Sequence, residues 1–357
     1  MKLGLFPAFL LGAISFVALG QGWGRREAMR PWLQGRFFEA EQQFAQKRRG
    51  IPAFPQLYLW EAEFEIERAR FGQAAALIHE AKSLRTPDTD GLPERRQARL
   101  LVSVGQFAQA YEVALEGRRW DGRDVQKLKV SSATDLVTLG EVTLARGGFA
   151  DAIAILEQAR DRAKNASSLD GLEWIRAQDG IAAANISLGS IQVASQVAHV
   201  AFSAAAREWG ANSVPAMDLL DTIGLIQVSE SDFKNAEVSL AQSRAWRETT
   251  YGPDHPKVAE SYMHAALLSA AQNQTADALR LVTHGLHIEQ ALAVAPAPNG
   301  RFALLLLSGA EIFATIGQAG QARTCYESAI PVLERELGPD APRLASARKR
   351  LGELLGK

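Results

Sequence analysis

The sequence of 357 residues contains a single cysteine, Cys325, so an intramolecular disulfide is excluded. Basic and acidic residues nearly balance, and the formal net charge of −1 gives no reason to expect nucleic acid as a partner. Alternation of apolar and polar residues, the pattern of a strand, is hard to find. Because Cys325 stands beside Tyr326 in a helical pattern, we expect a buried packing residue rather than a reactive thiol.

Motifs that carry chemistry are also scarce. His284 and His287 lie three residues apart with Glu289 nearby, but no residue between them completes a metal-binding helix. There is no lysine-bearing phosphate loop and no serine elbow. We therefore expect no metal, no cofactor and no catalytic residues, and an enzyme is the weakest interpretation.

A repeated spacing of apolar and small residues runs through the chain. Eight times an alanine follows three residues after an anchor position. The anchors are Phe37, Phe71, Phe107, Phe149, Ile191, Phe233, Thr275 and Ala319. They stand 34, 36, 42, 42, 42, 42 and 44 residues apart, a period that predicts a solenoid of helical hairpins.

Two further positions share this phase. A small residue nine positions before each anchor would let two antiparallel helices cross closely. These residues are Ala28, Ala62, Ala98, Gly140, Ala182, Gly224, Ala266 and Ala310. Two positions before each anchor stands a residue that in most units is glycine, serine or asparagine, which suits a helix end followed by a tight turn. These residues are Gly35, Ala69, Gly105, Gly147, Gly189, Ser231, Asn273 and Gly317.

These residues resemble the tetratricopeptide repeat, a family of paired helices stacked into a right-handed superhelix. The resemblance runs from Gln21 to the C-terminus and implies an all-α solenoid of about eight helix-turn-helix units. From the fourth unit on, the 42-residue spacing is similar to the kinesin light chain type, as are the segments 251–256 and 337–342. The eight extra residues would lengthen each second helix. Within 251–256, a capping role is expected for His255.

The first and last residues fall outside the repeats. Residues 1–20, with an apolar run over 3–19, read as a signal peptide, and an N-terminal membrane anchor is the alternative. Repeats 1–3 would occupy 21–128, and repeats 4–8 with their longer spacing 129–341. Residues 342–357 have the pattern of a capping helix, with Leu344, Ala347, Leu351 and Leu355 in one apolar stripe.

The first helices of such a family line the concave face, so their inward positions are candidate contacts for a peptide. The candidates are Glu63, Arg95, Arg99, Glu141, Asp179, Asp221, Met263 and Glu311. Arg95 and Arg99, helped by Arg96, form an arginine cluster that is either a solvated face or a site for a carboxylate. The middle of the groove would be acidic and the C-terminal part apolar, part of which could be interhelical core.

Three hypotheses follow from these observations. The first is an exported, non-catalytic scaffold that binds a peptide or protein segment in its groove. The second is a membrane-anchored assembly or quality-control factor, which would meet a membrane only through an uncleaved leader. The third is an enzyme with a helical accessory array, but the repeats leave no residues for a catalytic domain. We also expect an elongated array whose units contact only their neighbours.

Overall fold

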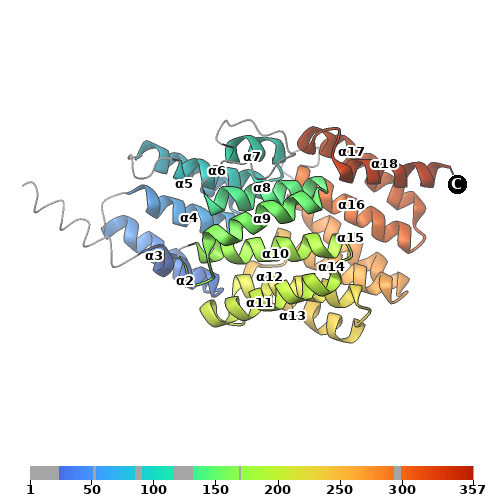
Figure 1. The fold of residues 1–357 in the computed structure, drawn as a ribbon, viewed down its shortest axis with the longest axis horizontal. Coiled ribbons are helices and arrows are strands. Elements are labelled where there is room, and N and C mark those ends of the chain that lie inside the picture. Colours follow the sequence, from blue (N-terminus) through green and yellow to red (C-terminus); the bar gives the residue numbers. More distant parts are fainter. Residues whose placement is uncertain are drawn as a thin grey trace, which may run out of the picture.

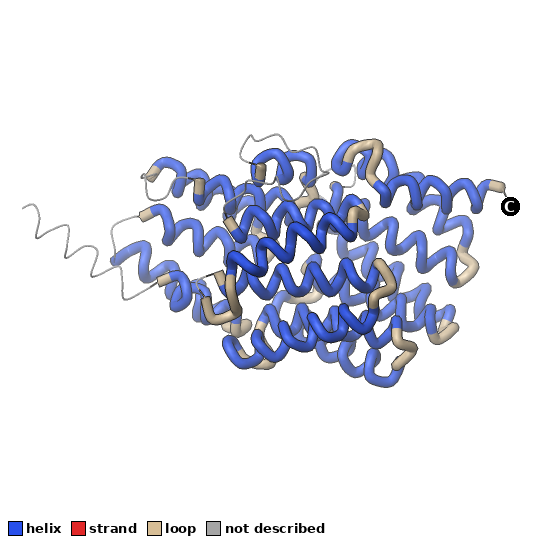
Figure 2. The backbone as a smooth tube through the Cα atoms, in the orientation of Figure 1, coloured by secondary structure: helices blue, strands red, loops and turns tan. Residues whose placement is uncertain are grey.

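The computed structural model describes residues 24–50, 54–84, 91–115, 132–168, 170–292 and 299–356. This part of the chain contains seventeen helices, α2 to α18, and no strand (Figures 1 and 2). The predicted all-α fold is therefore confirmed. The predicted signal peptide, residues 1–20, lies outside the described residues. Among the helices that are described, none is both long enough and apolar enough to span a bilayer.

The helices alternate between two layers, as eight pairs followed by α18. The first helices, which form the inner layer, are α2 (Arg25–Leu33), α4 (Pro55–Glu67), α6 (Leu92–Ser103), α8 (Ala133–Arg146), α10 (Gly171–Ser187), α12 (Val214–Ser229), α14 (Pro256–Ala271) and α16 (Gly300–Thr315). The second helices are α3 (Phe37–Gly50), α5 (Phe71–Ser83), α7 (Phe107–Ala114), α9 (Phe149–Ala163), α11 (Ile191–Trp209), α13 (Phe233–Tyr251), α15 (Thr275–Leu292) and α17 (Ala319–Leu337). Every predicted anchor is the first residue of a second helix. We number the pairs as units 1 to 8.

The turn inside each unit depends on one residue in the left-handed region. All eight predicted turn residues have a positive φ, including three that are not glycine, at 56° for Ala69, 61° for Ser231 and 60° for Asn273. The backbone closes as a Schellman motif: in unit 4, Gly147 N–H donates to Leu144 O at 2.9 Å, and the next N–H donates to Thr143 O at 3.1 Å. The sequence pattern thus identified the turns to the residue.

Each pair of helices crosses where side chains are small. The predicted first-helix alanines and the alanines three residues after the anchors are all fully buried. Gly140 is the clearest case, because a Cβ there would lie 2.4 Å from Leu156 Cδ2 of α9. A Cβ on Gly224 would likewise lie 2.5 Å from Leu240 Cδ2 of α13. Glycine replaces alanine in these two units because a leucine from the second helix occupies the space at the crossing.

The superhelix completes a turn, and units five positions apart come together. α2 of unit 1 contacts α12 of unit 6, α7 of unit 3 contacts α17 of unit 8, and α8 of unit 4 contacts α18 (Figure 1). Our expectation that units contact only their neighbours is therefore wrong. A solenoid that completes a turn brings its later units into contact with its first ones. The repeat spacing in the sequence does not indicate these contacts.

The contacts between turns use the left-handed residues of the early units. A Cβ on Gly105 would lie 2.2 Å from Arg301 N at the start of α16, and one on Gly147 would lie 3.0 Å from Arg343 N at the start of α18. Arg343 also donates from Nε to Ala145 O at 2.7 Å. By contrast, Gly189 of unit 5 has nothing within 4 Å of such a Cβ. In units 3 and 4, glycine therefore meets two requirements. It adopts a positive φ, and it leaves room for the backbone of a distant helix.

The last helix, α18 (Pro342–Leu355), covers the end of the array. Leu344 and Ala347 are buried against α17, as the apolar stripe predicted. Leu355, at the far end of that stripe, is 55% exposed. Cys325 is buried in the same core, and burial raises the pKa of its thiol to about 11, which fits the predicted packing role.

Candidate functional site: the inner face of the superhelix

Among the described residues, three of the cavities open between the first helices, and their linings differ in chemistry. The N-terminal cavity, about 550 Å³, is lined mainly by α4, α6 and the start of α8. The central cavity, about 470 Å³, is lined by residues from units 1 to 8. The C-terminal cavity, about 610 Å³, is lined by α12, α14, α16, α17 and α18. The inner face is thus divided into separate cavities along its length.

A buried ion cluster lies behind the N-terminal cavity. Glu63 has its carboxylate 2.7 Å from Arg96 Nη2 and 2.9 Å from Arg176 Nη1. Glu173 lies 2.7 Å from Arg25 Nη2. Burial alone would raise the pKa of Glu173, but Arg25, Arg96 and Arg176 together lower it to about 2. Both carboxylates are therefore charged and form ion pairs with arginines of the protein. Glu63 is thus a structural residue and is not available to bind a peptide.

The central cavity contains four of the predicted contacts, Arg99, Glu141, Asp179 and Asp221. Arg99 forms an ion pair with Glu141 across units 3 and 4. Asp179 accepts a hydrogen bond from Thr222 Oγ1 at 2.6 Å. Burial raises the pKa of Asp179 to about 6, although the bond from Thr222 acts in the opposite direction. Its negative charge is therefore destabilised in the folded protein at neutral pH.

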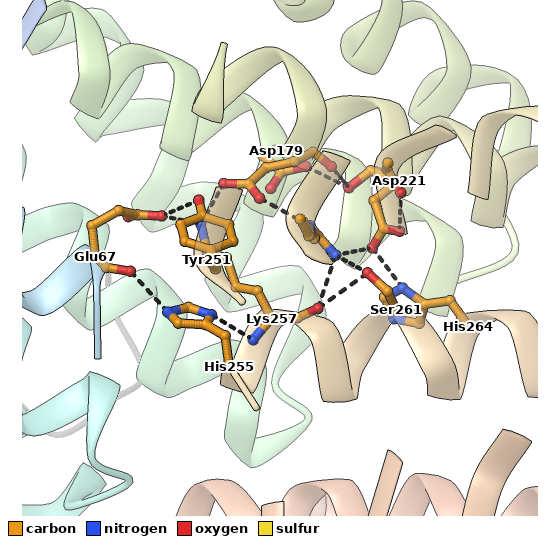
Figure 3. A network of polar contacts seen from close by, with 12 residues as sticks. Glu67, Asp179, Asp221, Tyr251, His255, Lys257, Ser261 and His264 are labelled. Carbon is orange, nitrogen blue, oxygen red and sulfur yellow. Dashed lines mark hydrogen bonds and ion pairs between the residues drawn. The ribbon is translucent and has the colours of Figure 1, made fainter. Parts of the chain in front are cut away.

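A network of polar contacts joins unit 2 to units 6 and 7 at the edge of this cavity (Figure 3). Glu67, the last residue of α4, accepts hydrogen bonds at 2.6 Å from both Tyr251 OH and Lys257 Nζ. Lys257 Nζ also donates to Asp218 Oδ2 at 2.7 Å. Burial and the Glu67 carboxylate raise the pKa of Tyr251 well above its usual value. These contacts close the superhelix between residues that lie about 190 positions apart.

His255 caps α14, as predicted, and also takes part in the closure. Its Nδ1 accepts a hydrogen bond from Lys257 N–H at 3.2 Å, so Nδ1 carries no proton. Its Nε2, 3.0 Å from Glu67 O, must then be the donor. Burial and the nearby Lys257 lower the pKa of His255 to about 3, so the ring is neutral and this tautomer is maintained at neutral pH.

Asp221 is the centre of the second half of the network (Figure 3). Its carboxylate accepts from Ser243 Oγ at 2.8 Å and from Arg247 Nη1 at 3.0 Å, and lies 2.6 Å from His264 Nδ1. Burial alone would raise the pKa of Asp221, but Arg247 and His264 lower it well below its usual value. Arg247 also donates to Asp218 Oδ1 at 2.9 Å. The carboxylate of Asp221 is thus already bonded to side chains of the protein itself.

Apolar side chains line much of the C-terminal cavity. Leu225, Met263 and Leu267 line it together with Tyr326 and Leu354. Met263 and Tyr326 are core residues that form its floor, whereas Leu267 is 42% exposed. The apolar residues predicted for the C-terminal part of the groove therefore divide between core and open surface, the two alternatives that the sequence left open.

The rim of the C-terminal cavity is charged. Glu311 lines it from α16, and Arg350 and Glu353 line it from α18. The Glu311 side chain is exposed over much of its surface, and partial burial of its carboxyl nevertheless raises its pKa. An apolar floor with a charged rim is a common arrangement for binding a peptide side chain.

Seven of the eight predicted groove residues line one of these cavities, and the eighth, Glu63, lies behind the first. They fall into three groups, and the predicted arginine cluster is divided: Arg95 faces the N-terminal cavity and Arg99 the central one. Sequence reasoning missed Glu67 and Arg247. The spacing of repeats relates residues along one face, but it contains no signal for contacts across a superhelical turn.

Among the described residues there is no group of three His, Cys, Asp or Glu side chains placed to hold a metal ion. His284 packs edge-on against the Tyr262 ring, with centroids 4.3 Å apart. Of the tryptophans, Trp209 is buried between helices, as its phase predicted, and Trp32 is fully buried.

Solved structures of helical repeat proteins share this fold. A Rap protein complexed with competence and sporulation factor matches with a TM-score of 0.53 and 14% identity, over 92% of this chain and 98% of that one. A chain of the APC/C hetero-tetramer Cut9-Hcn1 matches with a TM-score of 0.57 and 11% identity, over 96% of this chain and 59% of that one. No protein-family model and no curated protein matches the sequence. The chain is a superhelical solenoid of the tetratricopeptide-repeat type.

Proposed function

We propose that the protein is a non-catalytic scaffold that binds a segment of another protein on its inner face, with an apolar side chain of that segment in the C-terminal cavity. The observation that carries this proposal is Leu267. An aliphatic side chain that is 42% exposed inside a cavity of about 610 Å³ leaves apolar surface for a partner to cover.

The cavity also restricts the chemistry of the segment. Leu225, Leu267 and Leu354 offer an apolar wall for a leucine-sized or aromatic side chain, and Glu311 with Arg350 offers polar groups to the neighbouring backbone or side chains. An apolar anchor flanked by polar residues fits this arrangement. The structural similarity to a Rap protein in complex with a factor is compatible with such a role, but at 14% identity it supports only the fold.

Affinity capture from the native host with residues 21–357, followed by mass spectrometry, tests the proposal. Leu267→Asp should abolish recovery of the partner, because a carboxylate in the apolar wall would have to be desolvated. Val238→Asp is the matched control, since Val238 is a 61% exposed aliphatic residue on the second helix α13. Equal recovery with both variants would exclude the C-terminal cavity as the binding site.

We propose further that the protein is exported and that residues 1–20 are removed as a signal peptide. The apolar run over 3–19 and the small residues that follow support this. Expression of the full chain in a Gram-negative host should yield periplasmic protein that begins at Gln21, as measured by intact mass. Uncleaved protein in the membrane fraction would instead favour a membrane-anchored assembly factor.

We also propose that units 4 to 8 are of the kinesin light chain type. The lengths of the second helices of units 5 to 8 support this, because α11, α13 and α17 have 19 residues each and α15 has 18, whereas α3 and α5 have 14 and 13. In unit 4, α9 has 15 residues. Longer second helices were expected from the 42-residue spacing.

A further inference from the structure

The N-terminal cavity has an excess of positive charge on its walls. Four arginines line it, and Asp170 is the one acidic side chain among its described lining residues. The arginines are Arg25, Arg95, Arg96 and Arg162. At least three of them have acidic partners in the protein: Arg25 Nη1 lies 3.1 Å from Asp170, Arg95 Nε donates to Asp135 at 3.0 Å, and Arg96 Nη2 lies 2.7 Å from Glu63. Several guanidinium groups around one cavity attract an anion.

Arg96 is the member of this group that the protein leaves incompletely bonded. Its side chain is 10% exposed, and its Nη2 lies 2.7 Å from Glu63 Oε2. That carboxylate is shared with Arg176 and Arg25. Among the described residues, the buried Nε and Nη1 atoms of Arg96 have no hydrogen-bond acceptor. A buried guanidinium with unsatisfied N–H groups is destabilising until an acceptor is supplied, and an oxyanion that enters the cavity can supply it.

The start of α8 adds a second source of positive potential. Ser132 is the N-cap of this helix of 14 residues, its hydroxyl makes no capping hydrogen bond, and Ser132, Ala133 and Thr134 all line the cavity. Thr134 Oγ1 already donates to Glu173, at 3.1 Å. The free N–H groups and the dipole of a helix N-terminus favour an anion at this position.

We propose that the N-terminal cavity binds a phosphate group that is carried on an organic ligand. A phosphate monoester is close to a dianion at neutral pH and offers several acceptor oxygens in different directions, so it can engage more than one guanidinium together with the helix N-terminus. A carboxylate has a single charge and two oxygens in one plane, which one arginine can satisfy. The cavity of about 550 Å³ is larger than a phosphate group, and Leu59, Trp60 and Leu92 offer apolar surface for the rest of the ligand. This site is separate from the C-terminal cavity and does not depend on the function proposed for it.

Isothermal titration calorimetry on residues 21–357 tests the proposal, with phenyl phosphate, inorganic phosphate and acetate as probes at equal ionic strength. We expect phenyl phosphate to bind most tightly, because its ring can pack on the apolar wall, and acetate to bind most weakly. A short peptide with phosphoserine, compared with the same peptide without phosphate, distinguishes a phosphate borne by protein from a small ligand. Acetate binding as tight as phosphate binding would overturn the proposal.

Two variants locate the binding in this cavity. Arg96→Gln should weaken phenyl phosphate binding by about tenfold or more, since it removes charge-assisted hydrogen bonds. Ser132→Asp should fold at least as well as the original chain, because aspartate is a favoured N-cap, but its carboxylate should repel the phosphate and abolish binding. Arg160→Gln, on the same helix as Arg162 but bonded to Glu157 and Asp161, should change nothing. Unaltered affinity in a folded Ser132→Asp protein, or equal losses in Arg96→Gln and Arg160→Gln, would refute the site.

Discussion

The closure of the superhelix can be tested at Gly300, the first residue of α16. A Cβ on this residue would lie 2.2 Å from the carbonyl oxygen of Gly105 and 3.0 Å from ring carbons of Phe107, both in unit 3. Carbon and oxygen atoms in contact normally stand more than 3 Å apart, so units 3 and 8 would have to separate by about 1 Å. The φ of Gly300 is not in the left-handed region, so Gly300→Ala introduces the clash without backbone strain.

The expected loss of stability follows from this geometry. Glycine to alanine in an unobstructed helix usually stabilises a protein by about 0.5–1 kcal/mol. Overpacking against fixed atoms costs about 1–3 kcal/mol, and here one of the atoms is backbone and cannot rotate away. We therefore expect Gly300→Ala to lower the free energy of unfolding by about 1–3 kcal/mol. Gly320→Ala, in the first turn of α17 with nothing within 4 Å of the new Cβ, should raise it slightly.

Urea unfolding followed by circular dichroism measures both variants, and the opposite signs make the result decisive. A second pair checks the contact from the other side. Gly105→Ala and Gly189→Ala share the strain of a positive φ, but a Cβ on Gly105 also meets Arg301 N at 2.2 Å. Gly105→Ala should therefore be the more destabilising by about 1–3 kcal/mol. Equal stabilities within each pair would mean that units 3 and 8 do not touch in solution.

Three further predictions concern single positions. Gly140→Ala should destabilise by about 1–3 kcal/mol through its clash with Leu156, and Leu156→Ala should remove most of that penalty in a double-mutant cycle on thermal unfolding. Ala69→Gly should stabilise by about 1 kcal/mol, because φ is 56° there; a loss of stability in urea unfolding would contradict the turn geometry. Asp179 has a folded-state pKa of about 6 against an ordinary value of 3.8, so its contribution to stability is greatest below pH 3.8 and is lost as the pH rises to 6. Asp179→Asn should thus stabilise the protein by about 1–3 kcal/mol at pH 7.5 and by almost nothing below pH 4, and an equal gain at both pH values would refute the pKa assignment.

The repeat architecture was predictable from the sequence because it depends on local physics. A turn in the left-handed region needs a residue that tolerates it, and two helices that cross closely need small residues at the crossing. Both requirements act within one unit, so they recur at fixed spacing and reveal the start of every second helix. The capping role of His255 and the burial of Cys325 followed from the same register.

The candidate site was predictable only in part, for a physical reason. Position on a first helix pointed to Asp179, Asp221 and Glu311, which line cavities, but it could not tell which carboxylates would be paired within the protein. Asp221 is bonded to Arg247 and His264, whereas Asp179 accepts a hydrogen bond from the Thr222 hydroxyl. Such partners come from other elements, so burial and pairing are properties of the assembled superhelix.

The sequence by itself therefore determined the units of this protein: where each hairpin turns, which residues cross, and that the chain is all-α. The tertiary structure alone decided that units five positions apart meet, that Glu67 bonds to Lys257 across the closure, and that the described part of the inner face has separate cavities with different linings. The difference has one cause. Contacts within a hairpin are set by a few neighbouring residues, whereas the closure of a superhelical turn sums small rotations from every unit, and no single spacing in the sequence encodes that sum.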